Sequence, residues 1–304
     1  MKRTREKKSR KMERPGTEKT GTEEAQKVPG KSGVRVPERA AAQKRRESNA
    51  PLLRAGERLD DLQLNGLQFI QDPSLFCFGI DAVLLSGFAR IRPGEKVLDL
   101  CSGSGILPVL LSAKTKASHL TGLELFPENA MLAERNIRLN HLEERVDVIQ
   151  GDVKNHRQLL REAAFGAVTC NPPYIEELPP ERTPSDKKDS EGGRSELVTA
   201  ARHEIFCTLD DVARAASWAL KSSGRFFMVH RPFRLAQIIR TLSAHHLEPK
   251  RMRLVCPFAG KEPNMVLVEA VKGGRSGMVV EAPLIVYREK GVYTDEILSI
   301  YGIG

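Results

Sequence analysis

The 304-residue chain lacks the features of membrane, secreted and zinc-binding proteins. No apolar stretch approaches the ~18 residues of a membrane span, and no apolar segment follows the basic N-terminus as in a secretory signal. The five cysteines are scattered without a C-x-x-C pair, and the histidines lack the spacing of metal ligands. We therefore expect a cytoplasmic protein without a membrane segment, a disulfide framework or a metal site.

Excess charge is confined to one end of the chain. Residues 1–56 hold 17 Lys and Arg against 7 Asp and Glu, whereas the remaining residues hold 31 against 32. With no aromatic residue and no apolar period, this stretch is predicted to be a disordered basic extension. It is either an arm that contacts phosphates or a solvated extension without a catalytic role. Because the rest is almost neutral, the net charge of +9 does not by itself indicate nucleic-acid binding.

Beyond residue 56, short β-prone runs alternate with amphipathic segments. This alternation predicts an α/β fold, in which a mainly parallel sheet carries helices on both faces. We expect this domain to span residues 57–272, followed by a C-terminal tail, 273–304, with a short strand and a helix from about Thr294. Helices are expected near 106–112, 127–140, 208–220 and 232–244, and strands at 96–99, 119–124, 146–149, 167–170, 225–229, 252–255 and 265–270.

A glycine-containing turn, Asp99-Leu-Cys-Ser-Gly-Ser-Gly105, follows the first of these strands. Gly103 and Gly105 permit tight backbone angles and let a ligand approach the main chain beside Cys101. Pro108 stands where a dinucleotide fingerprint has its third glycine. The carboxylate of Asp99 would repel a pyrophosphate and attract an ammonium. S-adenosylmethionine carries an ammonium, a sulfonium and no phosphate, so the turn predicts a site for this cofactor.

Two further acids follow the next two strands. Glu124 lies 25 residues after Asp99, close to the spacing at which a carboxylate binds ribose hydroxyls. Asp152 follows the third strand, where it can accept a hydrogen bond from the exocyclic amine of adenine. Each acid alone is more often a solvated or helix-capping residue. Three acids at consecutive strand ends of one sheet favour a cofactor site, because ligands bind at the carboxyl ends of parallel strands.

The fourth strand ends in Asn171-Pro-Pro-Tyr174. Its prolines stiffen the turn, and the side-chain oxygen of Asn171 with the carbonyl of Pro172 can each accept one N–H of a planar amine. Tyr174 offers an aromatic face to a base. The alternative is a plain Asn-Pro turn with a core tyrosine. The next segment, 176–199, contains several prolines and is predicted to be a mobile loop.

Upstream, Phe76-Cys-Phe-Gly-Ile-Asp81 precedes an apolar helical stretch. Gly79 and Asp81 are candidates to wrap the methionine end of the cofactor. Asp81 is alternatively the N-cap of the helix. Both roles are compatible with the sequence.

The turn 99–105, Glu124, Asp152 and the turn 171–174 resemble the motifs of class I S-adenosylmethionine-dependent methyltransferases. That resemblance implies a Rossmann-like sheet of seven strands with the last strand antiparallel. Further motifs resemble bacterial tRNA1(Val) (adenine-N6)-methyltransferases: Arg58-Leu-Asp-Asp61, Phe78-Gly-Ile-Asp-Ala82, Ala201-Arg-His-Glu204 and Lys261-Glu-Pro-Asn264. The family implies N6-methylation of an adenine beside the anticodon of a valine tRNA, with tRNA as the partner.

Two alternatives stay open. The Asn-Pro-Pro-Tyr motif is shared with protein glutamine, ribosomal guanine and DNA adenine methyltransferases. The protein-glutamine family has a helical recognition domain before its glycine motif, whereas here only about forty residues, 57–95, precede the first core strand. A noncatalytic RNA-binding scaffold is the alternative outside enzymes, and the intact acids and Asn171 argue against it.

Overall fold

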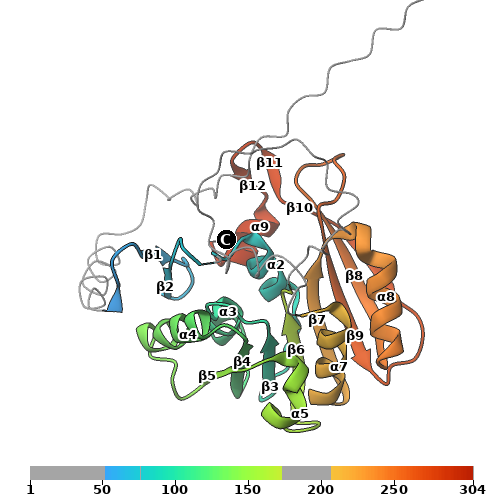
Figure 1. The fold of residues 1–304 in the computed structure, drawn as a ribbon. Coiled ribbons are helices and arrows are strands. Elements are labelled where there is room, and N and C mark those ends of the chain that lie inside the picture. The colour runs from blue at the N-terminus through green and yellow to red at the C-terminus, as the bar shows by residue number, and fades with distance from the viewer. Residues whose placement is uncertain (1–51, 76, 173–206, 304) are drawn as a thin grey trace, which may run out of the picture. The chain divides into compact units, whose positions relative to one another are not determined.

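The computed structural model describes residues 52–75, 77–172 and 207–303. They contain an eight-stranded sheet in the order β10-β8-β9-β7-β6-β3-β4-β5, with helices on both faces (Figure 1). The predicted α/β fold class is confirmed. The strands are β3 (Lys96–Leu100), β4 (His119–Glu124), β5 (Val146–Gln150), β6 (Phe165–Cys170), β7 (Leu220–His230), β8 (Leu247–Cys256), β9 (Met265–Lys272) and β10 (Val279–Ile285).

All seven strands expected from the sequence belong to this sheet. β3 pairs in parallel with both β4 and β6, and β6 pairs in parallel with β7. β9 is antiparallel to β7 and β8, so the prediction of one reversed strand is confirmed. Because β3, β4, β5, β6 and β7 run in the same direction, their carboxyl ends lie along one edge of the sheet.

Helices cover the sheet as the apolar periods predicted. One face carries α2 (Ile80–Phe88), α3 (Ile106–Lys114) and α4 (Pro127–Leu139), and the other carries α7 (Leu209–Ala219) and α8 (Leu235–Ala244). A full capping box between Thr208 and Asp211 begins α7. Pro232 begins a 3-10 turn, Pro232–Arg234, that leads into α8. A short helix, α5 (His156–Leu159), follows β5.

The C-terminal segment differs from the predicted seven-strand sheet. β10 pairs in parallel with β8 and adds an eighth strand at the edge. It is followed by the hairpin of β11 (Tyr287–Glu289) and β12 (Val292–Tyr293), and then by α9 (Asp295–Tyr301), whose N-cap is Thr294 as the sequence indicated. α9 packs on α2: a Cβ atom at Gly87 would lie 2.8 Å from a methyl group of Ile300. Residues after 272 therefore contribute to the core.

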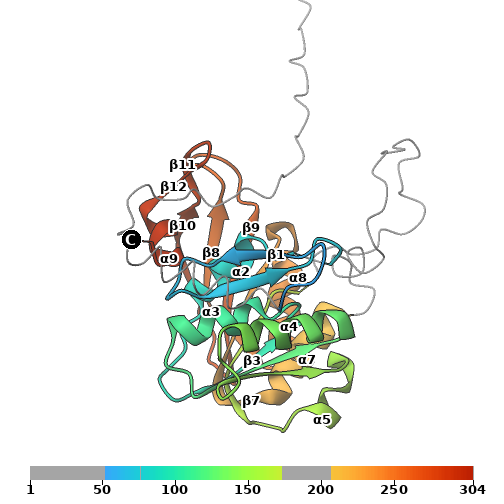
Figure 2. The ribbon, with the colours of Figure 1, turned by 90° about the vertical axis from the view of Figure 1, so that its left-hand side faces the viewer.

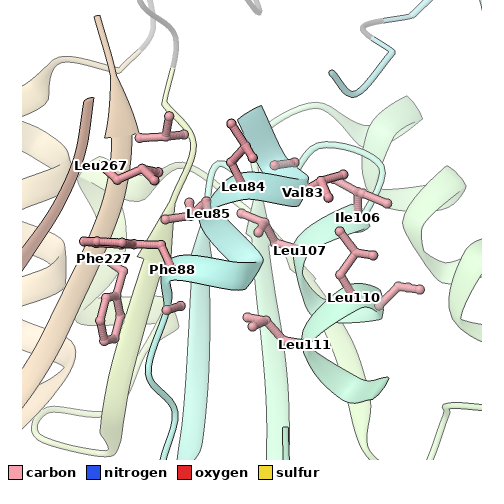
Figure 3. Close-up of a cluster of buried hydrophobic side chains, with 14 of the residues drawn as sticks. Val83, Leu84, Leu85, Phe88, Ile106, Leu107, Leu110, Leu111, Phe227 and Leu267 are labelled. Atoms are coloured by element: carbon pink, nitrogen blue, oxygen red, sulfur yellow. The ribbon is translucent and has the colours of Figure 1, made fainter. Parts of the chain in front are cut away.

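The core under α2 and α3 is densely packed. In Figure 3, Val83 of α2 lies beside Ile106 of α3, and Phe88 of α2 points toward Phe227 of the sheet. Phe88 meets the ring of Phe227 edge to face, with centroids 6.5 Å apart. All of these side chains are almost fully removed from solvent, which stabilises the fold by roughly 1.5 to 3 kcal/mol for each large apolar residue. The packing fixes the position of α2 over the sheet.

A second small sheet lies on α4, beside the main one (Figure 2). β1 (Arg58–Asp61) and β2 (Gln68–Gln71) form an antiparallel hairpin. Two buried asparagines of α4 bind its main chain. Asn140 bonds both the N–H and the C=O of Gln68, and Asn136 does the same for Ile70. The side chains of α4 thereby satisfy polar groups of a strand that has no partner on that side among the described residues.

Residues 52–56, which composition placed in the basic extension, are ordered with this hairpin. Leu52 and Leu53 pack against the cluster around Ile70, and the carbonyl of Leu52 accepts a hydrogen bond from Arg135. Arg135 also forms a buried ion pair with Glu57. Residues 1–51 and the predicted loop 176–199 lie outside the described residues. Across the described ranges, every helix is too short or too polar to span a bilayer.

Asn136→Ala is expected to lower the free energy of unfolding by about 2 to 3 kcal/mol. The side chain is fully buried, and its loss leaves the N–H and C=O of Ile70 without their partner. The carbonyl of Ser104 loses a partner as well. Urea denaturation measures the change, with Glu134→Ala on the exposed face of α4 as the control. Equal stability of the two variants would contradict this role.

Candidate functional site

The glycine turn after β3 has a left-handed backbone at three positions. Cys101, Gly103 and Gly105 have φ values of 57°, 56° and 84°. The space beside Gly103 is open, whereas a Cβ atom at Gly105 would lie 3.0 Å from the Cβ of Ala133 in α4. Gly105 thus permits close packing of α3 against α4, and Gly103 is the glycine whose main chain a ligand can approach. Cys101 adopts a conformation that is unfavourable for a residue with a side chain.

The carboxylate of Asp99 is buried at the end of β3. Its Oδ1 accepts a 2.7 Å hydrogen bond from Thr169 Oγ1 on β6, and its Oδ2 is buried without a hydrogen-bond partner among the described residues. Burial raises the pKa of Asp99 to about 7; the Thr169 bond and the nearby Ser102 hydroxyl oppose the shift, and the charge of Glu124 adds to it. An unsatisfied buried oxygen is the kind of group that a ligand N–H donor would satisfy.

Glu124 ends β4 and binds the glycine turn. Its Oε2 accepts a 2.8 Å bond from the N–H of Gly103, and its Oε1 accepts from the N–H of Phe126 at 3.0 Å and from the side chain of Asn129 at 3.4 Å. Burial raises the pKa of Glu124, although these hydrogen bonds partly offset the shift. The predicted ribose-binding acid is therefore already oriented by the turn that is predicted to hold the cofactor.

Asp152 follows β5, the next strand along the same edge. Its side chain accepts a 2.9 Å bond from the N–H of Lys154 and caps the 3-10 helix Val153–Asn155. The structure thus gives Asp152 the capping role weighed as its alternative. Its contact with adenine stays a prediction. The ends of β3, β4 and β5 are neighbours in the sheet, so Asp99, Glu124 and Asp152 lie along one edge as expected.

Asn171 and Pro172 continue directly from the end of β6. Leu100 of β3 pairs with Cys170 of β6, so Cys101 and Asn171 leave the two adjacent strands at the same level. The thiol of Cys101 lies 3.7 Å from the thiol of Cys207, the residue before the α7 cap. Tyr174 lies outside the described residues. The structure therefore brings the first half of the Asn-Pro-Pro-Tyr motif next to the glycine turn.

Gly79 and Asp81 are at the start of α2. The N-cap position is Gly79, and Asp81 stands in the first turn, where its Oδ1 accepts from the N–H of Ala82 at 2.9 Å. The alternative in which Asp81 is the N-cap is therefore wrong. Burial raises the pKa of Tyr301, and the charges of Tyr293 and Asp81 add to the shift, which places α9 near this end of α2. The contact of Gly79 and Asp81 with the methionine end of the cofactor stays a prediction.

The charges and spaces at this edge fit S-adenosylmethionine. Asp99 has a buried carboxyl oxygen without a hydrogen-bond partner among the described residues, and the space beside Gly103 is open. Within 52–75, 77–172 and 207–303, no three His, Cys, Asp or Glu side chains are grouped as a metal site requires. A cavity of about 280 Å³ between α4 and residues 54–75 contains none of the predicted site residues. The candidate residues converge instead on the carboxyl edge of the sheet.

The curated relatives and the family model that match this chain are named as methyltransferases. A family model described as the TRM5/TYW2 methyltransferase domain matches residues 87–174. A curated tRNA1(Val) (adenine(37)-N6)-methyltransferase from Shewanella halifaxensis is 26% identical over 184 residues, which cover 60% of this chain and 70% of the relative. The protein of that name from Aeromonas hydrophila is 25% identical, over 73% of this chain and 87% of its own length.

A solved structure extends the likeness to the fold. A predicted O-methyltransferase from Agrobacterium tumefaciens matches with a TM-score of 0.58 at 23% identity, covering 73% of this chain and 95% of that one. Together, these relatives confirm the predicted resemblance to class I S-adenosylmethionine-dependent methyltransferases.

The free energy of unfolding of the wild type is expected to fall as the pH rises, and the Asp99→Asn variant is expected to lack this decrease. In the cofactor-free protein, Asp99 keeps its proton up to about pH 7, whereas the unfolded chain releases it near 3.8. The unfolding free energy of the wild type should therefore fall relative to the variant between pH ~4 and ~7, by up to about 1.4 kcal/mol per unit. Above that range the difference should stay level.

Denaturant titrations at several pH values measure this difference. The exposed Glu128→Gln serves as a control for surface charge. Wild-type and Asp99→Asn curves that run parallel from pH ~4 to ~7 would contradict a buried, protonated Asp99.

Proposed function

We propose that the protein transfers a methyl group from S-adenosylmethionine to the N6 amine of an adenine in tRNA. The observation that carries the proposal is the juxtaposition of the buried Asp99 carboxylate with the Asn171 turn on adjacent strands. The curated relatives named for this reaction support it. An adenine beside the anticodon of a valine tRNA is the substrate that those names favour.

The cofactor site is formed by groups from consecutive strand ends. Asp99 accepts from the ammonium of the methionine part, and Glu124 accepts from the ribose hydroxyls. Asp152 accepts from the exocyclic amine of the cofactor's adenine. Main-chain groups from Cys101 to Gly105 line the site, and Gly79 and Asp81 close its methionine end. The order of these acids along the edge matches the order of charged and polar groups along the cofactor.

The substrate amine lies at the Asn171 turn. The side-chain oxygen of Asn171 and the carbonyl of Pro172 each accept one N–H of the amine, which draws its nitrogen toward tetrahedral geometry and localises the lone pair. Tyr174 stacks on the base. When bound, the cofactor supplies an electrophilic methyl carbon, so that a C–N bond forms as a C–S bond breaks. The nitrogen then releases its proton to water. Orientation of the two groups supplies much of the rate enhancement.

A glutamine amide in a protein is the second candidate acceptor. The family with that activity has a helical recognition domain before the glycine turn. Here residues 57–95 instead form the β1–β2 hairpin and α2 among the described residues. This favours an RNA adenine over a protein amide as the acceptor.

Asn171→Ala is expected to reduce methyl transfer by about 100-fold or more while leaving cofactor affinity within a few-fold. The substitution removes one of the two oxygens that hold the acceptor amine, and Asp99 and Glu124 remain in place. Single-turnover transfer and calorimetric cofactor titration measure the two quantities. Asp99→Ala is the matched variant and should weaken cofactor binding chiefly. Parallel losses of affinity in both variants would contradict the division of roles.

The substrate class is tested by offering labelled cofactor with total tRNA, total protein and DNA in parallel. We expect label in tRNA alone, and nuclease digestion should release N6-methyladenosine. Label in protein as N5-methylglutamine would select the second candidate. Binding of tRNA without label in any fraction, with cofactor bound normally, would select the noncatalytic scaffold.

A further inference from the structure

The segment that contains β7 and α8 carries basic residues and no acidic ones. Between Val212 and Leu247 there are six Lys and Arg residues and no Asp or Glu. Arg214 and Arg225 are paired, with Asp211 and Glu95 respectively. Arg231 and Arg234, beside the 3-10 turn, are bonded to other residues, whereas Lys221 on β7 and Arg240 on α8 are exposed. This segment offers positive charge in a folded part whose net charge is almost zero.

The 3-10 turn after β7 is held on both sides. Arg231, just before it, donates to the carbonyl of Asn264 at 3.1 Å. Arg234 ends it, is almost fully buried and donates to the side chain of Gln237 at 2.8 Å. Pro232 fixes the backbone angle of the first residue. These contacts hold the backbone of the turn, which presents one of its side chains to solvent.

That side chain is Phe233. It is 80% exposed, the most exposed of the large hydrophobic side chains in the described ranges, and it stands between two arginines. Its exposed ring leaves apolar area in contact with water. A single exposed apolar residue is common on protein surfaces. This one is distinguished by its position in the sheet.

Phe233 is close to the proposed acceptor site. β6 and β7 are hydrogen-bonded neighbours, and Cys170 is paired with Met228 (Figure 1). Pro172 follows Cys170 by two residues, as His230 follows Met228. Phe233 comes three residues after His230, so the Cα atoms of His230 and Phe233 are at most roughly 11 Å apart. Phe233 and the Asn171 turn thus follow the carboxyl ends of two adjacent parallel strands.

We propose that Phe233 stacks on an unpaired base of the RNA substrate next to the methylated adenine. The inference rests on the proposed function. Proteins that read single-stranded RNA combine aromatic platforms with cationic side chains, because every base has a π face and every linkage carries a charge. Among the described residues at this edge, Phe233 is the exposed aromatic side chain. It acts on substrate affinity and not on the transfer step.

Phe233→Ala and Phe233→Trp test this role in the full-length protein. The probe is a fluorescent anticodon stem-loop of a valine tRNA, with a fully paired duplex of the same strand for comparison. Phe233→Ala should weaken stem-loop binding about 10- to 100-fold and duplex binding much less, and Phe233→Trp should stay within a few-fold of wild type. Val279→Ala, 62% exposed on the edge strand β10, is the matched apolar control and should change neither.

Cofactor affinity and melting temperature should be the same in all four proteins, since Phe233 has no burial to lose. Stem-loop binding by Phe233→Ala equal to wild type would overturn the inference, even if the wild type methylates tRNA. Phe233-dependent binding of a stem-loop that receives no methyl group would sustain it while contradicting the proposed adenine-N6 reaction. Wild-type protein that methylates a protein glutamine and binds no RNA would overturn both.

Discussion

The hydrogen bond from Thr169 to Asp99 joins the two strands whose ends form the candidate site. It is buried between β3 and β6, and it fixes the register in which the glycine turn and the Asn171 turn leave the sheet at one level. A shift by one residue would move each side chain to the opposite face of its strand. The chemistry proposed for this edge therefore depends on an interaction inside the sheet.

Two buried acids next to each other make this edge electrostatically unfavourable without a ligand. Glu124 satisfies its oxygens with N–H groups of the glycine turn and the start of α4, whereas one oxygen of Asp99 has no partner among the described residues. The raised pKa values of both acids express the cost of removing a charge from water. A cationic cofactor would relieve that cost, which links the local instability of the site to binding.

Elements outside the central strands hold the site from the sides. Asn136 of α4 bonds both the β2 backbone and the carbonyl of Ser104 in the glycine turn, so the N-terminal hairpin and the turn share one support. On the other side, α9 packs on α2 near Asp81. The sequence suggested neither connection, because contacts between segments distant along the chain have no distinctive local pattern.

The sequence by itself determined the alternation of strands and helices, the glycine turn and the acids at strand ends, because these depend on local periodicity and backbone geometry. Tertiary structure decided which oxygen of Asp99 is satisfied, that Thr169 within an apolar run is its donor, and that Gly105 makes room for Ala133. It also decided that Gly79 caps α2 and that β10 joins the sheet. These features arise from strand register and from contacts between distant segments, which no local pattern encodes.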